Sequence, residues 1–234
     1  MHPAPGFWQT LWRVYKKDTV LEWRSPVGLF SVLLFAMILA AVYNYAMAES
    51  TFRQVRNLHG IMLATLFFAS TIVSGRNIHF EKEGGALRNM LMSPADPAGY
   101  FLGKVAALWQ LQIAFCVVFV PLYHLMLTGR PPGWREFQLP LLFLGMAALS
   151  LAALGIMLSY VAAGNRLREL VLPLLQLPTS LPVFMLAADG LAVSSAAASG
   201  GEAFAWNHFL ILIAPAAILC AIGCLLYHSM AADE

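Results

Sequence analysis

Charged side chains are scarce in this sequence of 234 residues. They make up 11% of the chain, whereas about a quarter of the residues in an average soluble protein are charged. Hydrophobic residues make up 60%, and the mean hydropathy is +0.71. Polar segments reach a length on the order of 20 residues, far below that of a typical domain. The composition therefore predicts a membrane protein without a soluble domain.

Cysteines are also few, and their positions exclude two kinds of site. Cys116, Cys220 and Cys224 all lie in apolar segments, where a thiol packs as a small apolar group. Two cysteines four residues apart on one helix cannot form a disulfide, and further metal-ligating residues are lacking near Cys220 and Cys224. We expect neither redox chemistry nor a metal site.

Motifs for nucleotide and hydrolytic chemistry are missing as well. The segment GYFLGKV at 99–105 has three residues between its glycines and a valine after Lys104, whereas a phosphate-binding loop requires four residues and then Ser or Thr. The sequence contains no nucleophile elbow and no His-Glu-x-x-His motif. We expect no catalytic residues, no ATP hydrolysis by this chain, no tightly bound cofactor and no nucleic-acid partner.

What the sequence does contain is six long apolar stretches. A helix needs about 20 mainly apolar residues to cross the ~30 Å hydrocarbon core of a bilayer. The stretches that reach this length are 26–47, 58–75, 102–127, 137–163, 167–188 and 208–230. We therefore predict an all-α integral membrane protein with one six-span domain at 26–230. The first stretch is too long for a cleavable signal peptide, so we expect it to direct insertion itself.

The positions of Lys and Arg predict the orientation. If the N-terminus lies inside, the inner segments hold Arg13, Lys16, Lys17, Arg24, Arg76, Lys82, Arg88, Lys104, Arg166 and Arg168. The outer segments then hold only Arg53, Arg56, Arg130 and Arg135. Cytoplasmic loops carry the excess of these residues, so we expect both termini in the cytoplasm.

The first 25 residues have the pattern of a helix that lies in the membrane interface. Apolar and aromatic residues recur there at helical spacing, namely Phe7, Leu11, Val14 and Tyr15, with Trp8 and Trp12 beside them. Lys16 and Lys17 lie on the other face, where cations meet anionic lipid. An ordinary anchoring helix and a specific lipid site both fit this pattern.

The loop at 76–98 is polar although apolar stretches flank it. Leu87, Met90 and Leu91 recur at the spacing of one helix face, and Ser93-Pro94 would end that helix. Asp96 and Pro97 then have the residue types of an N-cap and a first helical position, so a new helix should start there. A short amphipathic helix of this kind docks a partner or lies on lipid.

This loop resembles the first cytoplasmic loop of type-2 ABC exporter permeases. The shared features are an acidic pair, a glycine, spaced leucines, Ser-Pro and a closing Gly-Lys, here Glu81, Glu83, Gly84 or Gly85, Leu87, Leu91, Ser93, Pro94, Gly103 and Lys104. In that family the loop is a coupling helix that fits a cleft in a separate ATPase subunit. The resemblance implies ATPase docking by Glu81, Glu83, Gly84, Gly85, Leu87, Met90, Leu91, Ser93 and Pro94.

The fifth apolar stretch is rich in proline. Pro173, Pro178 and Pro182 each remove a backbone donor and leave a carbonyl that needs another partner. Nearby polar side chains could supply one, namely Gln176, Thr179 and Ser180. The prolines either make kinks that shape packing or make a break that lines a substrate path.

This proline-rich stretch, the loop ending in Ser-Pro and the sequence GKVAALW at 103–109 together resemble the B-subunit permeases of the cytochrome c maturation haem exporter. The resemblance covers nearly the whole chain. It implies a second copy of this chain, an ABC ATPase subunit, a haem-handling C subunit and a small D subunit in the bacterial inner membrane, with haem as the cargo for c-type cytochrome biogenesis. The alternatives are a permease for a lipid-linked glycan or drug, and a membrane assembly scaffold that transports nothing.

Three histidines fall at one expected membrane depth. In the predicted topology His59, His124 and His208 lie at the outer ends of their spans. Imidazole is a common axial ligand of haem iron, so these residues are candidates for a transient haem contact. A histidine is equally suited to the polar edge of the membrane, and the sequence does not say whether the three meet.

Overall fold

The computed structural model describes residues 6–24, 27–46, 55–83, 96–162, 168–200 and 206–232. These residues form α1 (Phe7–Arg24), α2 (Val27–Ala46), α3 (Val55–Glu83), α5 (Pro97–Thr128), α6 (Trp134–Ala162), α7 (Arg168–Gly200) and α8 (Trp206–Ala232). None of the described residues lies in a strand. The predicted all-α class is confirmed.

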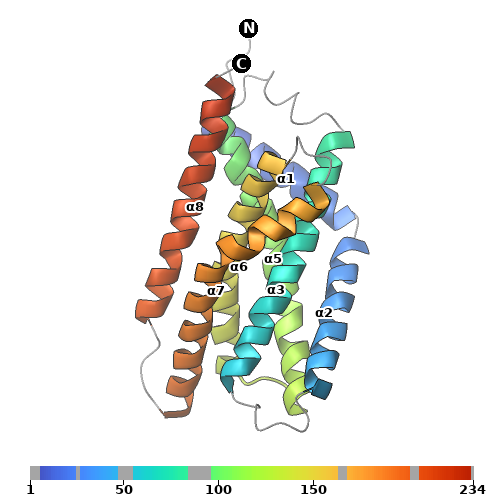
Figure 1. Cartoon of the computed structure of the whole chain (residues 1–234), viewed down its shortest axis with the longest axis vertical. Coiled ribbons are helices and arrows are strands. Elements are labelled where there is room, and N and C mark those ends of the chain that lie inside the picture. Colours follow the sequence, from blue (N-terminus) through green and yellow to red (C-terminus); the bar gives the residue numbers. More distant parts are fainter. Residues whose placement is uncertain are drawn as a thin grey trace.

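Six of these helices form a bundle and the seventh lies across one end of it. Figure 1 shows α2, α3, α5, α6, α7 and α8 running along the long axis, with α1 across the end where α8 finishes. We call this the α1 end, and the other the opposite end. The last turns of α3 and the first turns of α5 also lie at the α1 end (Figure 1).

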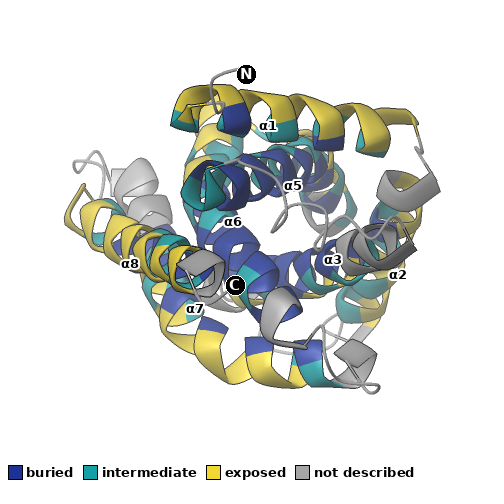
Figure 2. Ribbon diagram, turned by 90° about the horizontal axis from the view of Figure 1, so that it is seen from above, coloured by how far each residue is buried: buried dark blue, intermediate teal, exposed yellow. Residues whose placement is uncertain are grey.

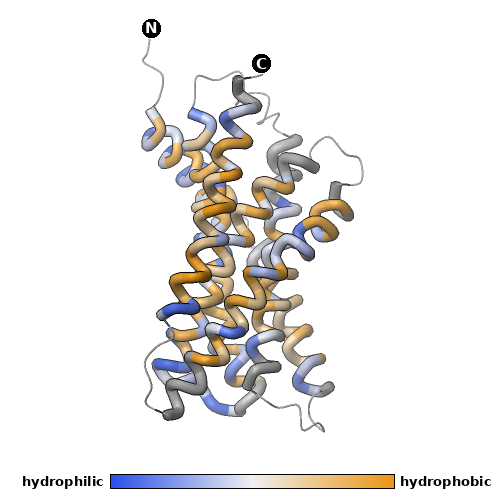
Figure 3. The backbone as a smooth tube through the Cα atoms, turned by 60° about the vertical axis from the view of Figure 1, so that its left-hand side comes forward, coloured by the Kyte–Doolittle hydropathy of each residue, from blue (hydrophilic) through white to orange (hydrophobic). Residues whose placement is uncertain are grey.

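Apolar residues cover most of the length of the bundle. Among the described helices, four are long and apolar enough to cross a membrane, namely α5, α6, α7 and α8, and α2 contributes a shorter apolar stretch at Phe30–Tyr45. Hydrophilic residues gather mostly toward the two ends of the helices (Figure 3). The structure thus fits a multi-pass membrane protein.

Helix α6 is the centre of the packing. Its fully buried residues are mostly small, and include Ala147, Ala148, Ala152 and Ala153. Glycines on α7 and α8 allow close contact with aromatic rings of α6 and α5. A Cβ atom at Gly190 would lie 2.3 Å from the Phe143 ring, and one at Gly223 would lie 2.1 Å from the Phe101 ring. Small residues at helix contacts are the usual means of close packing in membranes.

The start of α5 is the one that the sequence predicts. Asp96 is the N-cap, with φ −67° and ψ 121°, and Pro97 follows it. The backbone N–H of Gly99 donates to Oδ1 of Asp96 at 2.7 Å. At the other end, Gly129 closes the helix in the left-handed region at φ 71°, which a glycine adopts without steric cost.

Candidate functional site

The predicted docking residues lie mostly outside the part of the chain that the structure describes. Gly84, Gly85, Leu87, Met90, Leu91, Ser93 and Pro94 fall between the described ranges, and Glu81 and Glu83 end α3 without described side chains. What the structure does describe is the pair of helices on either side of this loop. Docking by these residues stays a prediction.

Helix α1 packs closely on α5 at two glycines. A Cβ atom at Gly99 would lie 2.7 Å from the carbonyl oxygen of Phe7, and one at Gly103 would lie 2.8 Å from that of Leu11. The segment GYFLG therefore acts as a small-xxx-small helix-packing motif. The three-residue spacing that excludes a phosphate-binding loop is the same spacing that allows this packing.

A buried ion pair joins the same two helices. Lys104 on α5 donates to Oδ2 of Asp18 on α1 at 3.2 Å, and Lys104 is only 1% exposed. The Lys104 ammonium also lies 5.2 Å from the centre of the Tyr100 ring, a distance at which a cation is attracted to the ring face. Breaking a buried pair leaves an uncompensated charge, so this contact holds α1 in place.

Further polar contacts extend along α1. Tyr15 donates a hydrogen bond to Oε1 of Gln110 on α5, and Thr19 donates to the same oxygen at 3.4 Å. Arg76 on α3 lies 3.7 Å from Glu22. Burial raises the pKa of Glu22, the Arg76 charge lowers it in part, and the Asp18 charge raises it further.

The orientation of α1 thus differs in one respect from the sequence-based interpretation. Lys16 and Lys17 are exposed as expected, and so are the aromatic residues Trp8 and Trp12. The buried residues of the helix, however, are the polar Thr10 and Asp18. Helix α1 is thus attached to the bundle through a mixed face that also includes the half-buried Val14. The side of α1 that faces away from the bundle is exposed (Figure 2).

A second polar cluster lies inside the bundle, where α3, α5 and α7 meet. Gln112 donates to the hydroxyl of Ser70 at 2.8 Å, and Gln176 donates to the same oxygen at 3.5 Å. Thr71 donates to Oε1 of Gln176 at 3.4 Å. Gln112, Gln176 and Ser70 are no more than 1% exposed. One transport-path candidate, Gln176, is therefore brought together with residues of two other helices.

The other transport-path candidates divide between the interior and the surface. Ser180 is buried, Pro173 is half-buried, and Pro178, Thr179 and Pro182 are exposed. Thr179 donates to the carbonyl of Leu175 at 2.9 Å and Ser180 donates to that of Leu177 at 3.0 Å. α7 stays helical through all three prolines, and its first part runs obliquely to the rest (Figure 1).

If the prolines make a functional break in a haem-exporter permease, as the resemblance implies, Pro178→Ala should leave insertion and assembly intact and uncouple ATP hydrolysis from cytochrome c maturation. The change lets α7 straighten, because the alanine restores a backbone donor and removes the clash with the preceding turn. Maturation and ATP hydrolysis measured on one preparation test this. Maturation at the wild-type level would favour kinks that serve packing alone.

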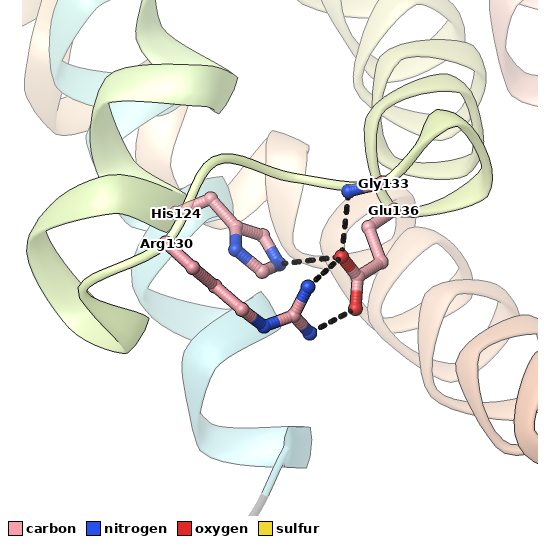
Figure 4. A network of polar contacts seen from close by, with 4 residues as sticks. All are labelled: His124, Arg130, Gly133 and Glu136. Atoms are coloured by element: carbon pink, nitrogen blue, oxygen red, sulfur yellow. Dashed lines mark hydrogen bonds and ion pairs between the residues drawn. The ribbon is translucent and has the colours of Figure 1, made fainter.

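At the opposite end, Glu136 organises the turn between α5 and α6 (Figure 4). Arg130 binds it with two donors, Nη2 to Oε1 at 2.7 Å and Nη1 to Oε2 at 3.0 Å. The backbone N–H of Gly133 donates to Oε2 at 2.7 Å, and Nε2 of His124 lies 4.0 Å from the same oxygen. His124 thus lies near a carboxylate that already accepts hydrogen bonds from Arg130 and from the backbone of Gly133.

The other two candidate histidines lie in separate helices. His59 near the start of α3 is buried, and its Nδ1 atom has no hydrogen-bond partner. His208 in the first turn of α8 is half-buried. Figure 1 shows these helix ends and the end of α5 at the same end of the bundle. Within the described ranges, no group of three or more His, Cys, Asp or Glu residues could hold a metal ion.

If these histidines contact haem, changing His59, His124 and His208 together to Ala should lower both the haem absorbance of the purified complex and the yield of mature cytochrome c. The physical reason is the loss of imidazole ligands to the iron. Changing the exposed His228 to Ala provides the control. Normal haem absorbance and normal cytochrome c would show that the three are interfacial residues.

Comparisons with known proteins give matches over most of the chain. The family model described as CcmB protein matches residues 9–229. A protein of Pseudomonas aeruginosa strain PAO1 named "Heme exporter protein B" is 30% identical over 179 residues, which cover 76% of this chain and 78% of that relative. The match includes all of α1 except its first two residues and all of α8 except its last three.

Proposed function

We propose, since the chain belongs to the CcmB protein family, that this haem-export permease couples a separate ATPase to haem delivery for c-type cytochrome biogenesis. The observation that carries the proposal is the family match, which extends over most of α1 and nearly the whole bundle. Haem is then a cargo that the complex handles. The chain itself contributes a membrane passage or an assembly surface, and the partner subunit contributes ATP hydrolysis.

We further propose six membrane spans, formed by α2, α3, α5, α6, α7 and α8. These helices lie side by side along the long axis, and α1 lies across one end, which supports this topology (Figure 1). The excess of Lys and Arg in the segments at the α1 end would place that end and both termini in the cytoplasm. In a bacterium this corresponds to the inner membrane.

The ATPase would dock at the α1 end. Support comes from the two helices that flank 84–95, because α3 ends and α5 begins at that end of the bundle (Figure 1). The proposed docking surface comprises the loop residues predicted from the sequence together with Glu81 and Glu83. A second copy of this chain and the C and D subunits of the maturation complex are the other proposed partners.

Changing Leu87 and Leu91 together to Asp should remove the ATPase from the purified complex. Burying a leucine contributes about 1.5–3 kcal/mol, and two new carboxylates would each have to be buried without a partner. Co-purification of a tagged chain with the ATPase subunit measures the effect. Asn89→Asp adds a charge at a position predicted to face away from the leucines, and it should keep the ATPase. Full retention of the ATPase by the double variant would contradict the docking role.

A further inference from the structure

Two acidic residues of α1 reach two different helices of the bundle. Asp18 and Glu22 are one helical turn apart and so lie on the same face of α1. Asp18 pairs with Lys104 of α5 at 3.2 Å, and Glu22 pairs with Arg76 of α3 at 3.7 Å. The face of α1 that turns to the bundle therefore connects α5 to α3.

These two helices are the ones that flank the proposed docking loop. α3 ends at Glu83 and α5 begins at Pro97, so any displacement of the loop reaches the bundle through them. Direct packing between α3 and α5 is sparse, whereas α1 and α5 share one of the most extensive helix contacts in the described structure. α3 and α5 also meet directly, at the Gln112–Ser70 hydrogen bond. The two ion pairs of α1 add a further connection between these helices at the α1 end.

The two ion pairs differ in how firmly they are held. Lys104 has a side chain 2% exposed and lies where α1 also approaches the backbone of α5 at Gly99 and Gly103. Arg76 has a side chain 26% exposed, and its pair with Glu22 is longer. Because exposed pairs are weaker than buried ones, α1 is fixed to α5 and held more loosely to α3.

We propose that α1 is a mechanical tie between the two helices of the docking loop, with Asp18 and Glu22 as positioning residues. The Asp18–Lys104 pair makes α1 move with α5, and the Glu22–Arg76 pair passes that movement to α3. This inference rests on the proposed function, since it concerns how ATPase docking is converted into movement of the bundle. The coupling passes through a helix that the sequence alone presents as a membrane anchor.

The test uses the Glu22–Arg76 pair, because variants of this pair keep the buried Asp18–Lys104 contact. The complex with its ATPase is purified for the wild type, for Glu22→Gln, for Arg76→Gln and for the exchanged pair Glu22→Arg with Arg76→Glu. Three quantities are measured: the ATPase retained, the rate of ATP hydrolysis, and the mature cytochrome c formed for each ATP hydrolysed. Lys16→Gln on the exposed face of α1 serves as the control.

Each single variant should retain the ATPase and form about fivefold less cytochrome c per ATP, a coupling effect of ordinary size. The exchanged pair should recover most of this loss, and Lys16→Gln should behave as the wild type. Unchanged maturation per ATP in both single variants, or an exchanged pair no better than they are, would overturn the inference. A wild-type chain that retains no ATPase would instead overturn the proposed function itself.

Discussion

Gly103→Ala should lower the thermal unfolding midpoint of the purified protein and make α1 accessible to trypsin. The new Cβ atom would lie 2.8 Å from the carbonyl oxygen of Leu11 and 3.0 Å from Cβ of Val14, so the backbone of α1 must move. Overpacking of this kind costs about 1–3 kcal/mol. Helix propensity alone would favour alanine over glycine by ~1 kcal/mol, so a loss of stability would report the clash. Cleavage after Lys16 or Lys17 measures the release of α1.

A matched glycine in another helix provides the control for this prediction. Gly145 in α6 is buried, and a Cβ atom there would have nothing within 4 Å. Gly145→Ala should therefore keep or raise the unfolding midpoint. If Gly103→Ala behaved in the same way and α1 stayed resistant to trypsin, the close contact between α1 and α5 would be contradicted.

Gly223→Ala should weaken the contact between α8 and α5, on the side of α5 opposite to α1. Its Cβ atom would lie 2.1 Å from Cζ of Phe101, a ring that is fully buried and adjoins Tyr227. The ring cannot swing into solvent, so α8 must move away from α5 or the ring must leave its rotamer, again at about 1–3 kcal/mol. We expect a lower unfolding midpoint in detergent and weaker association of α8.

The double variant Gly223→Ala with Phe101→Leu separates this clash from a general effect of the alanine. Leucine lacks the ring atoms that the new methyl group meets, so it should recover part of the stability that Gly223→Ala loses. Residues in direct contact give non-additive changes in free energy. Strictly additive effects of the two substitutions would mean that the ring and the glycine are not in contact.

The sequence predicted the elements of the fold well because their signals are local. Length and apolarity placed a helix at each of the six stretches, and most of the ends agree closely with those observed. The exceptions are α3, which continues past 75 to Glu83, and α7, which continues past 188 to Gly200. The N-cap at Asp96 followed from residue types alone, because an aspartate before a proline satisfies the first turn without any distant partner. The helix at Phe7–Arg24 followed from aromatic residues at helical spacing.

The contacts of the candidate site could not be predicted in the same way, because they join distant residues. In the sequence, Asp18 is one of several charged residues near the first span, and only the fold brings it to Lys104. Ser70, Gln112 and Gln176 are ordinary polar residues of apolar helices until α3, α5 and α7 meet. The glycines of GYFLG do carry a local signal, because small residues separated by three positions favour close helix packing, but the sequence does not show that α1 is the partner.

The buried pair between α1 and α5 also has a consequence for how the protein is made. Asp18 precedes Lys104 by 86 residues, and a ribosome adds roughly 5–20 residues each second during synthesis. The first helix therefore emerges on the order of ten seconds before its partner can enter the membrane. Until then Asp18 must remain hydrated at the membrane surface, since burying it alone would be costly. Helix α1 is synthesised before α5, yet it can reach its final position only after the start of α5 has been inserted.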